Sequence, residues 1–287
     1  MADDWKALTP PRRRSLVDAL KAKQDSFNQA NWALDLFLNF AFDAIKKQQE
    51  LTGEILVRLE GPINAQISSG QPLKLDASMA ELPAKTKQME LTTDELAALV
   101  KVMRRSHGTF DLQPQILREM VLIYSCALFD GLIADTLQTV FVHVPAQLQS
   151  GRKLTYEEAL AFDSRQDLVA ELAHRETIEV TRQNIEKQMA YFSTTHHLDV
   201  LESAGVTLDD IVKVTEQRNL FVHNNGIAST SYVQKHDNTR TPGKRIVLED
   251  EEMRESIRHL ARVGNEVING LVRKFAPNTE GPGMRGN

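Results

Sequence analysis

Cysteine is almost absent from this sequence. The one cysteine, Cys126, lies in the apolar run 122–128, so the chain can form neither an intrachain disulfide nor a cysteine-based zinc site. A lone cysteine among apolar neighbours is typical of a buried, inert thiol, and we expect this in preference to a reactive nucleophile. The fold must then depend on its hydrophobic core, which 287 residues can supply.

Helix breakers and excess positive charge are scarce as well. Only 10 prolines and 14 glycines occur, so most of the length is free to form regular structure. The formal net charge of -5 argues against a general nucleic-acid coat protein, whose affinity comes from many phosphate contacts, but it leaves room for one basic cleft. The segment 1–6 lacks the basic-then-apolar layout of a secretory signal, so we expect a cytoplasmic protein.

A long helix is expected over 16–59, with a break near Thr52. Its middle part is apolar except for four residues that recur at every fourth position and form a narrow polar stripe: Asn31, Asp35, Asn39 and Asp43. A membrane span needs about 20 apolar residues without such a stripe. We therefore expect no membrane partner, and a helix buried on most sides in a bundle or in an oligomer interface.

The remaining sequence predicts an all-α helical bundle with a long N-terminal helical extension. The segments expected after the first helix are a loop at 61–91, helices at 92–108, 111–142, 156–162, 167–192, 207–223 and 249–275, and a small β-like excursion near 230–248. Thr207 and Asp210 have the spacing of a capping box at the start of the 207–223 helix. We divide the chain into a helical arm and linker (1–110), a helical domain (111–277) and a disordered tail (278–287).

One segment carries a motif with chemical meaning. Within 216–226, Arg218 is followed by Asn219, and His223 stands five residues after the arginine, just before the helix-ending Asn224-Asn225-Gly226. This arrangement resembles the signature of the HEPN superfamily. The resemblance implies a bundle of four or five helices with the motif at the end of a late helix. The helices expected between 111 and 275 suit that layout.

Helix geometry bears on how these residues could act together. Asn219 and His223 lie one turn apart and face the same way. Arg218 projects about 140° round the helix from His223, so the two are not natural neighbours. Either the long arginine reaches round the helix, or two copies of the helix meet across a two-fold axis. The resemblance implies the second solution, a homodimer.

The resemblance further implies a metal-independent endoribonuclease without a cofactor. In RNA cleavage the neighbouring 2′-hydroxyl attacks phosphorus, so the substrate supplies the nucleophile, and the product carries a 2′,3′-cyclic phosphate. Arg218 suits the phosphate oxygens, and His223, with an ordinary pKa of about 6.5, suits proton transfer. Asn219 could hold His223 or a phosphate oxygen. We expect an RNA substrate and a role in toxin–antitoxin systems, antiviral defence or stress response. We expect the N-terminal arm to dimerise or to bind a sensor or inhibitory protein.

A second hypothesis stays open. The chain could be a non-catalytic helical module for dimerisation or partner binding, with the motif retained for structure, because an arginine near a helix end often pairs with a carboxylate. The HEPN toxins that are silenced by a nucleotidyltransferase often carry tyrosine two residues past the histidine. Asn225 stands there, so we do not expect that route of regulation.

Two other groups of residues are interpreted as ordinary surface. Adjacent histidines such as His196 and His197 rarely bind one metal ion, and we expect a solvated helix terminus there. The short basic runs at 12–14 and 244–245 could contact RNA phosphates, but a solvated surface is the simpler interpretation. No phosphate-binding glycine loop or dinucleotide fingerprint occurs.

Overall fold

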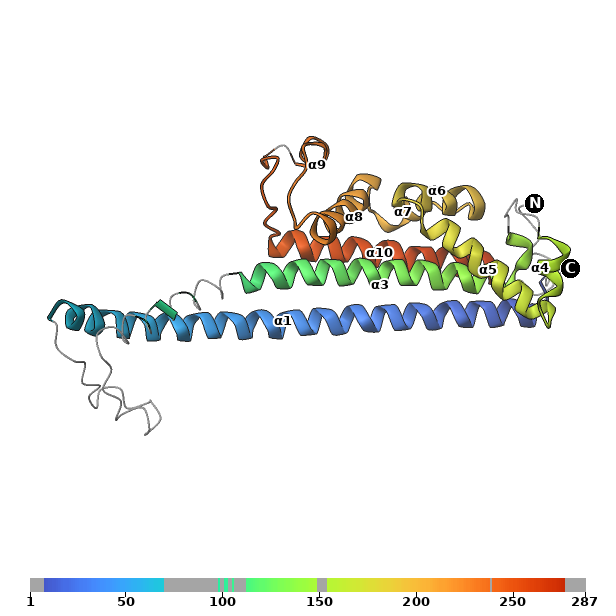
Figure 1. Cartoon of the computed structure of the whole chain (residues 1–287). Coiled ribbons are helices and arrows are strands. Elements are labelled where there is room, and N and C mark those ends of the chain that lie inside the picture. The colour runs from blue at the N-terminus through green and yellow to red at the C-terminus, as the bar shows by residue number, and fades with distance from the viewer. Residues whose placement is uncertain are drawn as a thin grey trace, which may run out of the picture. The chain divides into compact units, whose positions relative to one another are not determined.

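The computed structural model describes residues 8–69, 98, 101–102, 105, 112–148, 154–237 and 239–276, with the backbone alone for 55–56 and 58–69. Over these residues the protein is all-α, as predicted, and contains no β-strand (Figure 1). The elements in chain order are α1 (Pro10–Ser69), α3 (Gln113–His143), the 3-10 turn η4 (Pro145–Gln147), α4 (Tyr156–Leu160), α5 (Arg165–Thr181), α6 (Ile185–His196), α7 (Val200–Ala204), α8 (Leu208–His223), α9 (Thr230–His236) and α10 (Asp250–Phe275).

The chain forms two compact units. One consists of Met1–Leu34 with Arg118–Asn287, and the other of Asp35–Leu117. The first unit carries the arginine–histidine motif, together with the first part of α1. The predicted division of the chain at residue 110 stays a prediction. Most of the predicted 92–108 helix and the whole predicted tail at 278–287 lie outside the described residues.

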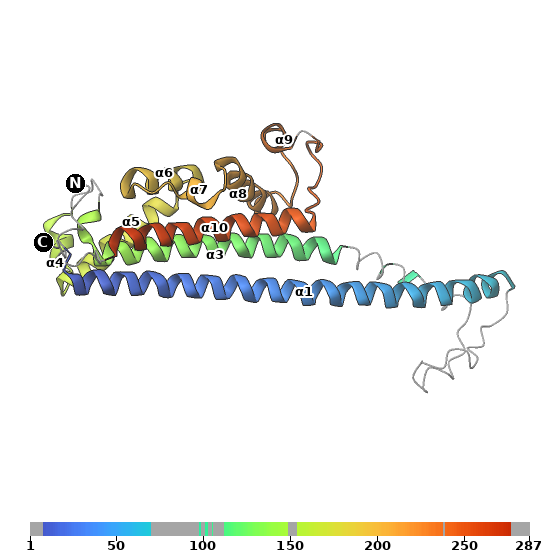
Figure 2. The same ribbon diagram turned by 180° about the vertical axis from the view of Figure 1, so that it is seen from behind.

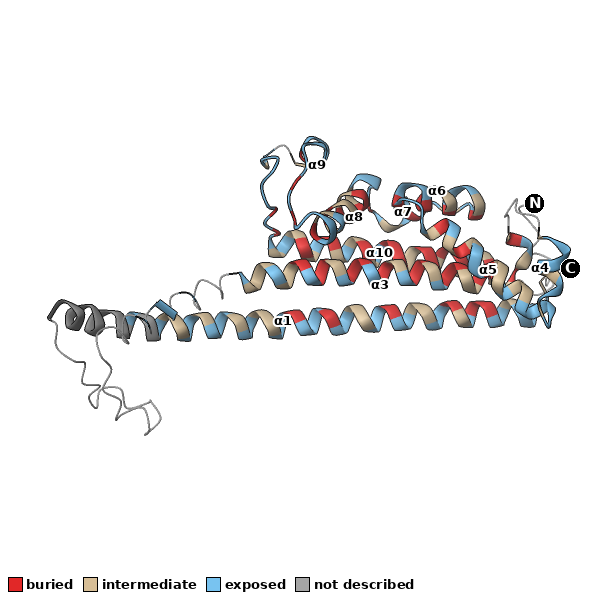
Figure 3. Ribbon diagram, viewed as in Figure 1, coloured by how far each residue is buried: buried red, intermediate tan, exposed pale blue. Residues whose placement is uncertain are grey.

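Helix α10 is the central element of the larger unit. Its buried residues recur at helical spacing along its length: Met253, Ser256, Leu260, Val263, Gly264, Val267, Ile268, Gly270, Leu271 and Phe275. A Cβ at Gly264 would lie 2.8 Å from Leu132 of α3 and 3.1 Å from Phe27 of α1, so three helices meet closely at this glycine. Helix α10 runs beside α3 in both views and contacts α7 and α8 (Figures 1 and 2). Buried residues concentrate on α3 and α10 (Figure 3).

Helix α3 is the one helix among the described residues that is long and apolar enough to cross a membrane. Half of its most apolar 18-residue stretch is nevertheless buried inside the fold. Phe129, Ile133 and Leu137 are almost completely shielded from solvent. This burial against other helices is typical of a core helix in a soluble protein.

Helix α1 continues without the predicted break near Thr52. The Thr52 hydroxyl donates to the carbonyl of Gln48 at 2.7 Å, so this side chain bonds within the helix and does not interrupt it. The predicted loop at 61–91 is wrong at its start, because the helix extends to Ser69. The predicted burial on most sides is also not met within one chain, since Trp32 is 67% exposed and Phe40 is 68% exposed. An oligomer interface over this helix stays a prediction.

The segment predicted as one helix over 167–192 is divided into α5 and α6. Asn184 begins α6 as its N-cap, where its side-chain oxygen accepts from the Lys187 amide at 3.1 Å. The Gln188 side chain donates to the carbonyls of Thr181 at 3.1 Å and Gln183 at 2.8 Å, which satisfies the end of α5. Polar side chains therefore stabilise a break that hydrophobic periodicity does not reveal.

The excursion between α8 and α10 differs from the predicted hairpin. Residues 230–236 form helix α9, because Ser229 caps it by accepting from the Tyr232 amide at 3.1 Å, and Tyr232 and Val233 are buried together. Among the described residues, extended pairing is limited to one antiparallel bridge between Ile227 and Arg245. The β-branched and aromatic residues of this segment serve a helix that packs on the core.

Candidate functional site

Helix α8 carries the motif, and its start is fixed as predicted. The Thr207 hydroxyl accepts from the Asp210 amide at 3.1 Å, and the Asp210 carboxylate accepts from the Thr207 amide at 3.1 Å, which completes a capping box. Ile211, Val214 and Phe221 are buried on one side of the helix. This packing determines which side chains near the helix end remain outside.

The end of α8 also agrees with the sequence. The Gly226 amide donates to the Leu220 carbonyl at 2.9 Å, and Asn225 and Gly226 have φ values of 49° and 72°, in the left-handed region. Arg245 secures this end, since it donates to the Asn225 side chain at 2.9 Å and pairs with Glu119 at 2.8 Å. Arg245 is therefore an ion-paired structural residue, and it is also exposed, as predicted for a solvated surface at 244–245.

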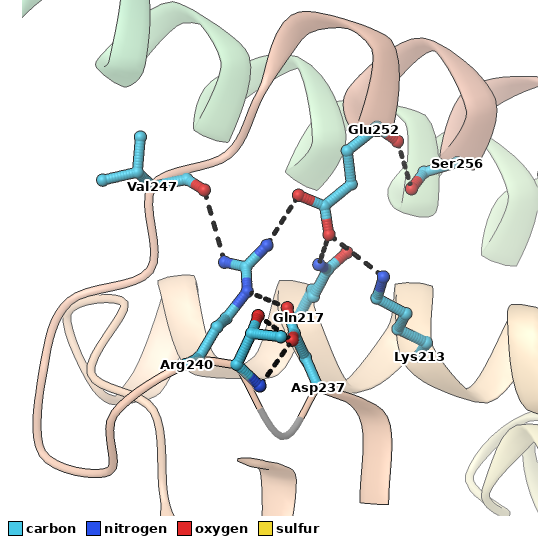
Figure 4. A network of polar contacts seen from close by, with 8 residues as sticks. Lys213, Gln217, Asp237, Arg240, Val247, Glu252 and Ser256 are labelled. Carbon is cyan, nitrogen blue, oxygen red and sulfur yellow. Dashed lines mark hydrogen bonds and ion pairs between the residues drawn. The ribbon is translucent and has the colours of Figure 1, made fainter.

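A polar network holds α8 against α10 (Figure 4). The Gln217 amide donates to the Glu252 carboxylate at 2.7 Å, and Lys213 lies 3.1 Å from the same carboxylate oxygen. Arg240, from the loop after α9, pairs with the second oxygen of Glu252 at 2.8 Å and with Asp237 at 2.7 Å. Burial alone raises the pKa of Glu252, but the cations outweigh burial, so the net shift is downward.

Helix α9 is held to α8 by a second carboxylate. Glu216 accepts from Lys235 at 2.8 Å and contacts the ring of His236 at 2.7 Å. The side chain of His236 is only 3% exposed, so its contact with Glu216 is shielded from solvent on the histidine side. The residues immediately before Arg218, Glu216 and Gln217, therefore each anchor a neighbouring element and fix the rotation of α8 about its axis.

Arg218 is half-buried and anchored. It donates through Nη2 to the Asp130 carboxylate of α3 at 2.6 Å, and through Nη1 to the Asn219 side-chain oxygen at 3.0 Å. Its side chain keeps 30% of its exposure, so part of the guanidinium still faces solvent. The structure thus brings Arg218 and Asn219 together through a direct hydrogen bond.

Cys126 lies one turn before Asp130 on α3 and is 2% exposed, so the prediction of a buried thiol is confirmed. Burial raises the pKa of this thiol to about 12, with Arg218 acting in the opposite direction. The thiol is therefore neutral near pH 7. It therefore adds no negative charge that would compete with Asp130 for the Arg218 guanidinium.

His223 occupies the last turn of α8 and is exposed. Over the part of the chain that the structure describes, its ring makes neither a hydrogen bond nor an ion pair with Arg218 or Asn219. Val222, which is 47% exposed, lies between Arg218 and His223 on the helix surface. One chain therefore leaves the arginine and the histidine on separate flanks of the helix end.

Asp130 is the residue of this site that the sequence interpretation missed. It is the one charged residue in the stretch 120–134, which is otherwise apolar or small. A lone carboxylate in a core helix needs a nearby cation, because burying an unpaired charge is costly. That rule could have predicted a cationic partner for Asp130, although it could not have named Arg218.

The two adjacent histidines differ from each other. His197 is exposed, as predicted for a solvated helix terminus, but the prediction is wrong for His196, which is 1% exposed. Neither ring nitrogen of His196 has a hydrogen-bond partner among the described residues, and burial lowers its pKa to about 3. His196 packs instead against the rings of Tyr191 and Phe192. Within the described residues, no group of three or more His, Cys, Asp or Glu side chains is placed to hold a metal ion.

Taken together, the end of α8 presents an anchored guanidinium bonded to an amide, and an accessible imidazole on another flank of the same helix end. A guanidinium and an amide can bind phosphate oxygens, and an imidazole can donate or accept a proton. Comparison with protein-family models, curated proteins and solved structures found no match for this chain.

Proposed function

We propose that this protein is a metal-independent endoribonuclease of HEPN type that works as a homodimer in the cytoplasm. The observation that carries the proposal is the end of α8, where Arg218 is oriented by Asp130 and Asn219 while His223 stays accessible. An anchored guanidinium is suited to a phosphate whose charge grows in the transition state. The accessible imidazole can reach a substrate and can donate or accept a proton.

The proposed reaction uses the RNA's own hydroxyl. The 2′-oxygen forms a bond to phosphorus as the bond from phosphorus to the 5′-oxygen breaks, which leaves a 2′,3′-cyclic phosphate. The 2′-hydroxyl gives up a proton to a neutral imidazole, and the leaving 5′-oxygen takes a proton from an imidazolium. In a dimer the His223 of one copy accepts the first proton and the His223 of the other copy donates the second, and Arg218 stabilises the charge on the non-bridging oxygens.

Exposed apolar side chains support the dimeric part of the proposal. Met120 is 61% exposed and Tyr124 is 51% exposed, one turn apart on α3, the helix that also carries Asp130. Val222 is 47% exposed between the two motif residues. A second copy that covered such residues would exclude water from them and could bring the arginine of one copy towards the histidine of the other.

Incubation of the purified full-length protein with total RNA and with tRNA tests the proposal. We expect cleavage in the presence of a chelator, products with cyclic phosphate ends, and loss of cleavage in His223→Ala with fold and oligomeric state unchanged. His174→Ala is the matched control, because His174 is also an exposed helical histidine. Undiminished cleavage by His223→Ala, or a strict need for magnesium, rejects this mechanism.

A second function is favoured by one contact. The ion pair between Arg218 and Asp130 at 2.6 Å gives the arginine a structural partner, as expected for a non-catalytic dimerisation or partner-binding module. That function predicts no RNA cleavage at any pH and a measurable loss of stability in Arg218→Ala, because Asp130 would lose its cation. Cleavage that depends on His223 separates the two functions.

A further inference from the structure

Asp130 contacts Arg218 from a different helix. The two residues are 88 positions apart in sequence, and Nη2 of Arg218 lies 2.6 Å from Oδ2 of Asp130. Their side chains keep 30% and 46% of their exposure, so the pair is at the border between core and solvent. A charge-assisted hydrogen bond this short, with both helices packed in the core, restricts where the guanidinium can point.

The guanidinium is held at two different nitrogens. Nη2 donates to Asp130, and Nη1 donates to the Asn219 side chain at 3.0 Å. A guanidinium has five N–H groups in a rigid plane, so two fixed bonds define its orientation and leave further N–H groups for a ligand. Among the described residues Asp130 is the one carboxylate that pairs with Arg218. The plane of Arg218 is therefore set before any phosphate arrives.

Asp130 orients the guanidinium, but its negative charge also weakens the binding of a phosphate to that guanidinium. A carboxylate beside the arginine repels an anionic ligand, and the repulsion is larger where solvent is partly excluded. Burial raises the pKa of Asp130, and the Arg218 cation opposes this rise without cancelling it, so the net shift is upward. One side chain thus orients the guanidinium and also weakens ground-state attraction for RNA.

We infer that Asp130 is a positioning residue that fixes Arg218 for transition-state stabilisation at the expense of RNA affinity, an inference that rests on the proposed ribonuclease function. A residue that only maintained the fold would lower activity by unfolding a fraction of the protein. It would not tighten RNA binding. If Asp130 is a positioning residue, removing its charge should lower kcat and at the same time strengthen RNA binding. These two opposite changes distinguish a positioning residue from one that only maintains the fold.

The test uses two substitutions at one position. Asp130→Asn keeps an oxygen that can accept from Arg218 but removes the charge, and Asp130→Ala removes both. With a short RNA substrate we expect kcat to fall about tenfold in Asp130→Asn and about a hundredfold in Asp130→Ala. The KM should fall about threefold in Asp130→Asn, because the anionic neighbour is gone.

Asp135→Asn is the matched control, because Asp135 lies on the same helix and pairs with Lys23 at 2.7 Å. It should leave kcat and KM unchanged. Asp130→Asn with wild-type kinetics, or with a raised KM and wild-type kcat, overturns the inference, and so does an equal effect in the control.

Binding of a 2′-deoxy oligonucleotide, which lacks the nucleophile, separates this inference from the proposed function. Asp130→Asn should bind this probe about threefold more tightly than the wild type does, whether or not cleavage is observed. A wild-type protein that binds but never cleaves RNA rejects the ribonuclease and, with it, the role in turnover. Equal binding by the wild type and Asp130→Asn, in a protein that does cleave, rejects the inference alone.

Discussion

The side-chain amide of Gln217 donates to the carboxylate of Glu252 at 2.7 Å, and this bond ties α8 to α10 one residue before Arg218. Glu252 is the centre of the network, because Lys213 and Arg240 also converge on it (Figure 4). The carboxylate side chain is 19% exposed. Its charge therefore holds α8, α10 and the loop after α9 together. These bonds determine which face of α8 is exposed to solvent.

The first prediction concerns this carboxylate. Glu252→Gln should lower the free energy of unfolding by about 2–3 kcal/mol, because Arg240 and Lys213 lose a half-buried anionic partner. Urea denaturation monitored by circular dichroism measures the change. Glu251→Gln is the control, since Glu251 is adjacent, 77% exposed and paired with Arg258, and it should cost less than about 0.5 kcal/mol.

The pH dependence of the same substitution has a definite sign. The pKa of Glu252 is lowered on folding, so its contribution is present above the pKa of the unfolded chain and is lost as the pH falls through the folded value. The stability difference between the wild type and Glu252→Gln should therefore be largest near neutrality and should shrink in acid. A difference that grows on acidification would contradict this account.

The second prediction concerns Gly226 at the end of α8. Its φ of 72° is unfavourable for other residues, and a Cβ there would lie 3.1 Å from the Phe221 ring. Gly226→Ala should destabilise the protein by about 2 kcal/mol, measured by thermal unfolding. Gly243→Ala isolates the backbone cost and should cost about 1 kcal/mol. Gly243 has a φ of 77°, and apart from its two chain neighbours no described residue has an atom within 4 Å of the added methyl group. Equal losses in the two variants would show that the Phe221 contact is unimportant.

The third prediction is a pH dependence that originates at His196. Burial lowers the pKa of this ring to about 3, whereas a histidine in an unfolded chain titrates near 6.5. Between these values the unfolded state binds a proton that the folded state does not. The free energy of unfolding should therefore fall as the pH drops below about 6.5, by up to about 1.4 kcal/mol per pH unit.

Two histidine variants test that origin. His196→Phe should flatten the slope of stability against pH between about 4 and 6, because the group that gains a proton on unfolding is removed. His197→Asn should keep the wild-type slope, since His197 is exposed and asparagine tolerates its left-handed φ of 57°. Identical slopes in the wild type and His196→Phe would show that other groups cause the acid sensitivity.

The fourth prediction concerns the proposed dimer. Tyr124→Lys places a charge on the exposed apolar part of α3 and should raise the dimer dissociation constant at least about tenfold, as measured by analytical ultracentrifugation. RNA cleavage should fall with the dimer and recover at high protein concentration. Tyr156→Lys is the control, because Tyr156 is 91% exposed on α4. A wild-type protein that stays monomeric, or a Tyr124→Lys dimer of normal strength, excludes this surface.

The sequence by itself determined the helical class, the location of the motif, and the bounds of α3, α4, α8 and α10 to within two residues. Caps and breakers act over three or four residues, so the Thr207–Asp210 box and the left-handed end at Asn225 and Gly226 could be predicted from their neighbours alone. The start of α9 depends on equally local chemistry at Ser229, but the aromatic and β-branched residues that follow favoured the wrong element. Local sequence signals predict an element correctly only where neighbouring residues do not favour a different element.

Tertiary structure alone decided which charges meet and which polar groups are buried. Asp130 reaches Arg218 across 88 residues because α3 and α8 pack in one core, and no local pattern encodes that distance. His196 and His197 are adjacent in sequence, yet helix α6 turns one into the core and the other to solvent. The physical reason is that burial depends on the direction of a side chain relative to the packed helices, whereas sequence spacing fixes that direction only within a single helix.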